Sequence, residues 1–223
     1  MGKGKLAKFA ENETFSNLFQ PLYEDVSKQG FPLKGRWGAD FFQNTNPIVL
    51  ELGCGKGEYT VGLSEKYPKK NFIGIDIKGA RIWRGLKQTR EKNLNNVAFL
   101  RTRIHNINLF FASNEVNEIW ITFPDPQPKK ENKRLTCQRF LDNYKNLLTP
   151  NGILHLKTDD TALYEYTLET IKDQKHQLLL HSDDLYRKGN PSLEVMEIQT
   201  FYEKMWLEMG KKIKYIQFQL NPE

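Results

Sequence analysis

The chain has 223 residues and a mass of 26.1 kDa, the size of one ordinary domain, so a single core and a single site are expected. Hydrophobic residues make up 39% of it and no apolar run approaches the roughly 20 residues of a membrane-spanning helix, which argues against a disordered chain and against a membrane anchor. Lys and Arg outnumber Asp and Glu by 33 to 27, and the net charge of +6 suits a polyanionic partner.

The few cysteines and histidines do not suggest a metal site. Cys54 and Cys137 allow at most one disulfide and cannot hold zinc alone, and the four histidines show no metal-ligand spacing. We therefore expect no metal, and two free thiols in a reducing cytoplasm. The Met-Gly-Lys-Gly-Lys start also lacks the apolar region of a secretory signal.

Residues 1–33 are expected to form a basic N-terminal extension, with its mobility left open. Lys3, Lys5 and Lys8 fall in a start that contains no acid, so they form either a solvated terminus or a polyanion-binding segment. Aromatic side chains then recur with partial helical periodicity until glycines and a proline interrupt it. Residues 34–223 are predicted to form a single domain, because no linker or repeat divides them.

Strand-like and helix-like segments alternate from residue 47 onward. Such alternation predicts a mostly parallel sheet with helices on both faces and a ligand at the carboxyl ends of the strands. The segment 213–220 alternates partly and suits an antiparallel strand closing the sheet edge. The predicted strands are 47–52, 71–76, 97–101, 118–122 and 153–157, and the predicted helices are 58–67, 79–91, 136–148 and 161–171.

A glycine-rich turn, ELGCGKG at 51–57, follows the first of these strands directly. Gly53, Gly55 and Gly57 allow a sharp turn and a close approach of backbone to ligand. A dinucleotide-binding fingerprint would need glycine where Glu58 stands, and the phosphate-binding loop pattern also fails. The acid that leads the turn, Glu51, instead suits a ligand with a cationic amine.

Asp76 ends the second strand, 25 residues after Glu51. In a doubly wound sheet this position lies beside the glycine turn, and a carboxylate there can accept from both hydroxyls of a ribose. The glycine turn and the two acids together indicate S-adenosylmethionine (SAM) as ligand. The plainer interpretation is a tight turn with Asp76 as a helix cap.

The fourth strand leads into a proline-rich, basic loop, FPDPQPKK at 123–130. Three prolines fix the backbone around Asp125, so this carboxylate can be held steady. Lysines and an arginine follow at once, and they would give the same loop a phosphate-binding surface. A rigid surface turn is the alternative.

From about residue 34 to 216 the sequence resembles the bacterial tRNA (guanine-N7)-methyltransferase family. The resemblance implies a Rossmann-like class I methyltransferase, with a mostly parallel seven-stranded sheet, helices on both faces and an antiparallel edge strand. The matching motifs are KGRW near 34, ELGCGKG at 51–57, FIGID at 72–76, FPDPQPKK at 123–130, HLKTD at 155–159 and TFYEKM at 200–205.

The resemblance also assigns site residues. It implies that Asp125 is catalytic and also borders the cofactor. Gln127 stands where the family usually has Trp, Arg103 stands where it usually has an acid near the adenine, and the basic loop is shorter. The remaining implied positions are Glu51, Gly53, Gly55, Gly57, Asp76 and Arg103 for the cofactor, Lys129, Asp159, Thr200 and Glu203 for the substrate, and Lys130, Lys133 and Arg134 for RNA.

The activity implied by the resemblance is transfer of a methyl group from SAM to N7 of a guanosine in the variable loop of tRNA, position 46, with S-adenosylhomocysteine as product. The N7 lone pair would attack the methyl group directly, in line. We expect tRNA as partner, a cytoplasmic location and no obligatory protein partner, with monomer and homodimer both open. The alternatives are an inactive Rossmann-like RNA-binding module, or a methyltransferase with a substrate other than tRNA.

Overall fold

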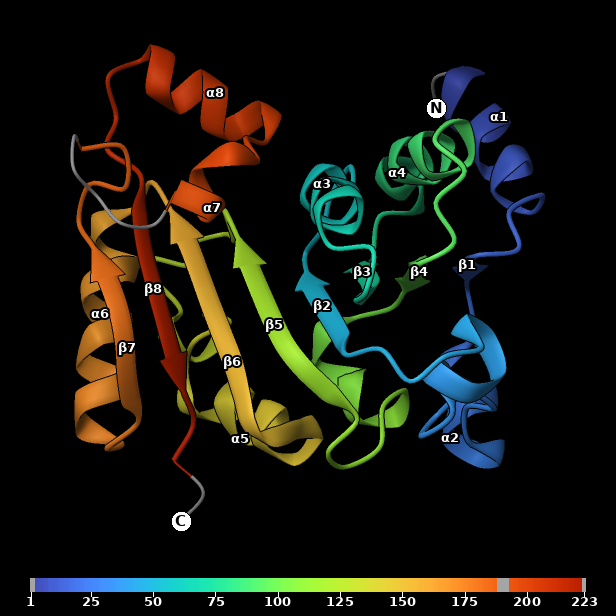
Figure 1. Cartoon of the computed structure of the whole chain (residues 1–223), viewed down its shortest axis with the longest axis horizontal. Coiled ribbons are helices and arrows are strands. Elements are labelled where there is room, and N and C mark those ends of the chain that lie inside the picture. Colours follow the sequence, from blue (N-terminus) through green and yellow to red (C-terminus); the bar gives the residue numbers. More distant parts are fainter. Residues whose placement is uncertain (1–2, 188–192, 222–223) are drawn as a thin grey trace.

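The computed structural model describes residues 3–187 and 193–221. Within them, eight strands form one sheet in the order β1-β4-β3-β2-β5-β6-β8-β7 (Figure 1). The strands are β1 (Leu18–Phe19), β2 (Ile48–Leu52), β3 (Asn71–Asp76), β4 (Val97–Arg101), β5 (Val116–Thr122), β6 (Leu148–Thr158), β7 (Gln177–Ser182) and β8 (Lys214–Gln219). The helices are α1 (Lys3–Asn12), α2 (Tyr23–Gln29), α3 (Glu58–Lys66), α4 (Gly79–Glu91), α5 (Gln138–Leu147), α6 (Thr161–Asp173), α7 (Leu193–Glu197) and α8 (Phe201–Glu208), with short turns η1 (Trp37–Phe42), η2 (Ile104–Leu109) and η3 (Glu131–Lys133).

The predicted fold class is confirmed, and the sheet differs from the prediction in two details. The two-residue strand β1 adds an eighth member by pairing with β4. Strand β8 is antiparallel as expected, but it lies between β6 and β7 and pairs with both, so β7 is the edge strand. No strand is predicted from the sequence at β7, because this strand is largely exposed and its residues do not alternate as those of a half-buried strand do. No helix of the described part is long and apolar enough to cross a bilayer.

The two faces of the sheet are covered by different helices. Leu50 and Leu52 of β2 point into the large core that α5 and α6 close, while Val49, which precedes Leu50, points into the core beneath α3. This alternation follows from the two-residue period of a strand. Because β4, β3, β2, β5 and β6 pair in parallel, their carboxyl ends lie at one edge of the sheet. Figure 1 shows α7 and α8 above this edge, over the arrowheads of β5 and β6.

The N-terminal segment packs against the rest of the chain. The ring of Phe19 lies edge-on to Trp37 at 5.0 Å, and the indole of Trp37 donates to the carbonyl of Phe110 at 3.0 Å. Helix α1 lies on α4, where Asn12 donates to the carbonyl of Gly79 and the indole of Trp83 donates to Glu11. The boundary at residue 33 stays a prediction, but the described residues before it contribute to the same hydrophobic cores.

Removing residues 1–33 is expected to abolish cooperative unfolding. The deletion removes the buried side chains of Phe15, Val26 and Phe31. Each contributes about 1.5–3 kcal/mol, so the sum rivals the roughly 5–15 kcal/mol that stabilises a whole domain. Thermal unfolding followed by circular dichroism tests this, with a chain lacking only residues 1–4 as control. A sharp transition in the longer deletion would show that the segment is dispensable.

Candidate active site

The glycine loop joins β2 to α3 and is tied to the end of β3. The backbone N–H groups of Gly53 and Cys54 both donate to the carbonyl of Ile75, at 2.8 and 3.0 Å. Gly57 has a φ of 71°, and a Cβ on it would lie 2.7 Å from the ring of Phe99, so this glycine faces the core. The loop conformation therefore requires glycine here for both backbone and packing reasons.

The other two loop glycines face open space. A Cβ on Gly53 would meet no atom within 4 Å, and one on Gly55 would meet only a backbone oxygen at 3.9 Å. The space beside them is a small cavity of about 90 Å³ at the carboxyl ends of β2 and β5. It is lined by Glu51, Gly53, Cys54, Gly55, Lys56, Glu58, Arg81, Thr122, Phe123, Thr200 and Tyr202.

Glu51 is buried at the edge of this cavity. Its carboxylate accepts from the backbone N–H of Thr60 at 2.8 Å, from the Thr60 hydroxyl, and from the Thr122 hydroxyl at 2.7 Å. Burial raises the pKa of Glu51 to about 7, against these hydrogen bonds, which lower it. The group is thus poised to ionise when a cation enters the cavity.

Asp76 is held by backbone donors on both carboxylate oxygens. Gly55 N–H donates to Oδ2 at 2.9 Å, and Lys78 N–H donates to Oδ1 at 2.7 Å. The structure therefore brings Asp76 together with the glycine loop and, through it, with Glu51. Each oxygen keeps a further lone pair for a ligand hydroxyl.

Arg103 does not line the same cavity. It borders a separate, larger hollow of about 610 Å³ together with Ile77, Arg101 and His105. Ile77 follows Asp76 directly and is 48% exposed, which is unusual for an isoleucine at the end of a buried strand. Ile77 is not among the site residues expected from the sequence, although an apolar residue next to a strand-end acid was the available signal.

The proline-rich loop after β5 holds Asp125 at the surface. The Asp125 Oδ1 atom accepts from the backbone N–H of Gln127 at 3.1 Å. Phe123 and Gln127 both have a φ of 47°, in the left-handed region that non-glycine residues rarely adopt. This strain on both sides of Asp125 is typical of loops whose position serves a function. Asp125 itself does not line the cavity that Phe123 borders.

Arg134 requires a correction to the set of RNA-binding residues. It is 5% exposed, its Nε donates to the carbonyl of Pro126 at 3.1 Å, and its guanidinium lies over the ring of Tyr166. An ion pair with Glu131 at 3.2 Å completes its surroundings. Arg134 thus supports the proline-rich loop from inside, because burial leaves it no face for a polyanion.

The other residues of the basic loop remain accessible. Lys129, Lys130 and Lys133 are all exposed. Among the described residues they have no ion-pair partner, so their charge is available to a ligand. The loop follows β5, which neighbours β2 in the sheet on the side opposite to β3.

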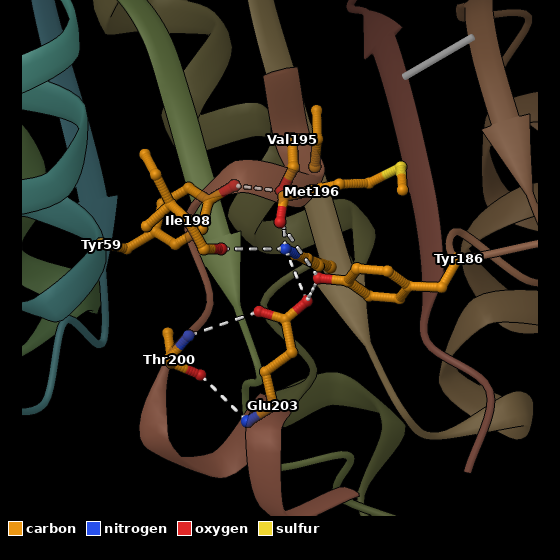
Figure 2. A network of polar contacts seen from close by, with 8 residues as sticks. Tyr59, Tyr186, Val195, Met196, Ile198, Thr200 and Glu203 are labelled. Carbon is orange, nitrogen blue, oxygen red and sulfur yellow. Dashed lines mark hydrogen bonds and ion pairs between the residues drawn. The ribbon is translucent and has the colours of Figure 1, made fainter. Parts of the chain in front are cut away.

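Thr200 lies at the cavity, whereas Glu203 is buried in the interior. Thr200 lines the cavity and caps α8, where its hydroxyl accepts from the Glu203 N–H at 3.2 Å. The Glu203 carboxylate is fully buried and pairs with the ammonium of Lys157 at 2.6 Å (Figure 2). Glu203 was predicted to bind substrate, and this arrangement instead directs its carboxylate away from the cavity.

Lys157 fixes the segment that carries these residues. Its ammonium donates to the carbonyl of Val195 at 2.8 Å and to that of Ile198 at 3.3 Å, and Tyr186 donates to Glu203 at 2.6 Å (Figure 2). Burial lowers the pKa of Lys157, and the Glu203 carboxylate opposes this effect. Lys157 is not among the residues expected from the sequence, although a lysine inside an apolar strand was the signal for a buried pair.

Asp159 lies just beyond the end of β6 and forms an ion pair with Lys211 at 2.9 Å. It is partly exposed and does not line the cavity, so its proposed contact with substrate stays a prediction. In the described part of the chain, no three His, Cys, Asp or Glu side chains gather as a metal site would need.

Comparison with known proteins agrees with this geometry. The family model Methyltransf_4, described as "Putative methyltransferase", matches residues 45–216. The chain is 54% identical to the tRNA (guanine-N(7)-)-methyltransferase of Christiangramia forsetii, over 98% of this chain and 99% of that protein. It is 55% identical to the protein of the same name from Porphyromonas gingivalis, over 94% and 86%. A solved SAM-dependent methyltransferase from Aquifex aeolicus shares the fold with a TM-score of 0.54 at 15% identity, over 89% and 98% of the two chains.

A Rossmann-like sheet with a glycine loop after β2 and an acid ending β3 is the arrangement of nucleoside-binding enzymes, and the family model matched over residues 45–216 shows that this chain is a methyltransferase. More narrowly, the identity over nearly the whole chain shows that it belongs to the tRNA (guanine-N7)-methyltransferase family. The family assignment made from the sequence motifs is thereby confirmed.

The buried ion pair predicts non-additive effects on stability. Lys157→Met leaves the Glu203 charge buried and unpaired, so we expect the free energy of unfolding to fall by about 3–5 kcal/mol. Lys157→Met combined with Glu203→Leu removes both charges and is expected to cost less than the single change, although loss of the α8 cap costs about 1 kcal/mol. Urea denaturation of Lys157→Met, Glu203→Leu, the double variant and the parent gives the coupling energy. Additive losses would show that the two groups do not depend on each other.

Proposed function

We propose that this protein transfers the methyl group of SAM to N7 of a guanine in tRNA. The single observation that carries the proposal is the identity of 54–55% over nearly the whole chain to two proteins named for this activity. The site supplies matching chemistry, because it offers an acid for an amine, an acid for ribose hydroxyls and glycines where a ligand approaches. An inactive RNA-binding module would not need these features.

The cofactor is proposed to extend from the small cavity to the larger hollow. Glu51 would face the amino group of the methionine part, with Gly53 and Gly55 against its chain. Asp76 would accept from the ribose hydroxyls, since its carboxylate is already oriented by two backbone donors. The adenine would then lie against Ile77, with Arg103 at the far side of the hollow.

The bound cofactor supplies an electrophilic methyl group. Guanine N7 carries a lone pair and no proton, so neither a general base nor a metal ion is required at that atom. The protein has to position the base and stabilise the positive charge that develops on it. Asp125 is proposed to do so from the strained loop, with Lys129, Asp159 and Thr200 contacting the nucleotide and Lys130 and Lys133 contacting phosphates.

The decisive experiment is to methylate tRNA with radiolabelled SAM and to digest the product to nucleosides. The proposal expects the label in 7-methylguanosine at one position of the variable loop. Label in another nucleoside, or in protein, would show that the substrate is not the proposed guanine of tRNA. Absence of SAM binding in calorimetry would favour the inactive RNA-binding module. A tRNA substrate also implies that the protein works in the cytoplasm. Both a monomer and a homodimer are compatible with this function.

Replacing Asp125 is expected to slow methyl transfer with little change in tRNA binding. Asp125→Asn keeps an oxygen that accepts from the Gln127 N–H and so preserves the turn, while it removes the charge. Because only the transition state carries the growing positive charge, single-turnover rates of both Asp125→Asn and Asp125→Ala are expected to fall on the order of 100-fold, with the tRNA Kd within about threefold. A full rate with Asp125→Asn would show that the carboxylate serves the turn alone.

Binding of SAM is expected to release a proton near pH 6. The pKa of Glu51 is raised to about 7, so the group is mostly protonated below that value and must ionise to face an ammonium. Affinity should therefore rise with pH up to about 7, by at most about tenfold per pH unit, and level off above it. Calorimetry in buffers of different ionisation enthalpy measures the proton, and Glu51→Gln is the control that should release none. Equal proton release by the two proteins would exclude Glu51 as its source.

A further inference from the structure

A surface made by α1 and α4 carries many positive charges next to the cavity. Helix α1 lies along α4, joined by the contacts of Asn12 with Gly79 and of Trp83 with Glu11. We call this the α1–α4 surface. Its six cationic side chains are Lys5, Lys8, Lys78, Arg81, Arg84 and Lys87, and the side chain of Lys3 lies outside the described part.

None of these six cations has an ion-pair partner among the described residues. Elsewhere on the molecule, lysines do pair with acids, as Lys92 does with Glu65 at 2.7 Å and Lys66 with Glu197 at 2.5 Å. Helices α1 and α4 carry two acids, Glu11, which accepts from the indole N–H of Trp83 at 2.7 Å, and Glu91 at the end of α4. Six cations against two acids leave the surface with a net positive charge.

Two of the lysines converge on one aromatic ring. The ammonium groups of Lys8 and Lys87 lie 4.6 and 5.3 Å from the indole of Trp83. Each ammonium lies within cation–π distance of the ring, so one indole holds two cations on the α1–α4 surface. The indole carries no net charge, so both positive charges remain for an anionic ligand.

The α1–α4 surface adjoins the proposed methylation site. Arg81 both belongs to it and lines the cavity beside the glycine loop. From Arg81 to Lys87 the helix rises about 9 Å along its axis. In the sheet, α4 leaves β3 on one side of β2, while the loop with Lys130 and Lys133 follows β5 on the other side. The two cationic regions therefore flank the cavity.

We infer that the α1–α4 surface binds the phosphate backbone of the tRNA, on the opposite side of the cavity from the proline-rich loop. This inference rests on the proposed function, because it takes tRNA as the substrate. A polynucleotide fits better than a small anion, since the charges extend along a helix and a single phosphate could meet only a few of them. The contacts fix how the tRNA lies and do not distinguish its sequence.

The test uses a variant of the whole chain, K5Q/K8Q/R84Q/K87Q, and leaves Arg81 intact because it lines the cavity. The control is K28Q/K69Q/K172Q/K175Q, which removes the same charge from exposed positions elsewhere. The affinity for purified tRNA is measured over a range of salt concentrations. Each phosphate contact adds roughly 0.7–0.9 to the slope of log affinity against log salt, so the slope should fall by roughly 3 in the first variant and by less than about 1 in the control.

Equal slopes in the two variants would overturn the inference, since the effect would then come from net charge alone. A slope that changes only when Lys130 and Lys133 are replaced would also overturn it. Unchanged melting temperatures and SAM affinities establish that the variants are folded. If the parent protein neither binds nor methylates tRNA, the proposed function itself fails. If the parent binds tRNA and K5Q/K8Q/R84Q/K87Q keeps the same salt dependence, only the inference about the α1–α4 surface fails.

Discussion

The site depends on how the glycine loop is fastened to the end of β3. One carbonyl, that of Ile75, accepts two N–H groups of the loop, and the carboxylate of Asp76 accepts a third from Gly55. Two of these bonds join backbone groups, and the third needs only the Asp76 carboxylate. Glu51, at the start of the loop, is thereby kept at a fixed place relative to Asp76. The hollow for a ligand is a consequence of this short set of hydrogen bonds.

The opposite wall of the cavity is built differently. There a segment distant in sequence, 195–208, is held by side chains, and the central interaction is the ion pair of Lys157 with Glu203 (Figure 2). Carbonyl groups and a tyrosine hydroxyl complete the hydrogen bonding of the pair, which a buried charge requires. One wall is thus fixed by backbone and the other by a buried polar network, and Thr200 and Tyr202 lie where the second wall meets the cavity.

Sequence patterns predicted the central elements well, because buried strands and amphipathic helices have strong periodicity. The bounds of β3, β4 and α4 agree with the predicted ranges. The exposed edge strand β7 was missed for the opposite reason, since it has no buried face to leave a pattern. Arg134 and Glu203 show a second limit. A sequence gives the charge of a side chain but not its burial. Arg134 lies over Tyr166 and Glu203 pairs with Lys157, and both partners are distant along the chain.

The position of Glu51 also bears on how the enzyme distinguishes fresh cofactor from spent cofactor. The amine that this carboxylate would face is common to SAM and to S-adenosylhomocysteine, as are the hydroxyls that Asp76 would accept from. Neither acid can therefore favour the donor over the product. On the proposed function, preference for the donor has to arise near Phe123 and the strained loop, where the methyl group is presented. Inhibition by accumulated product is then a built-in property, and sustained turnover depends on its removal by other enzymes.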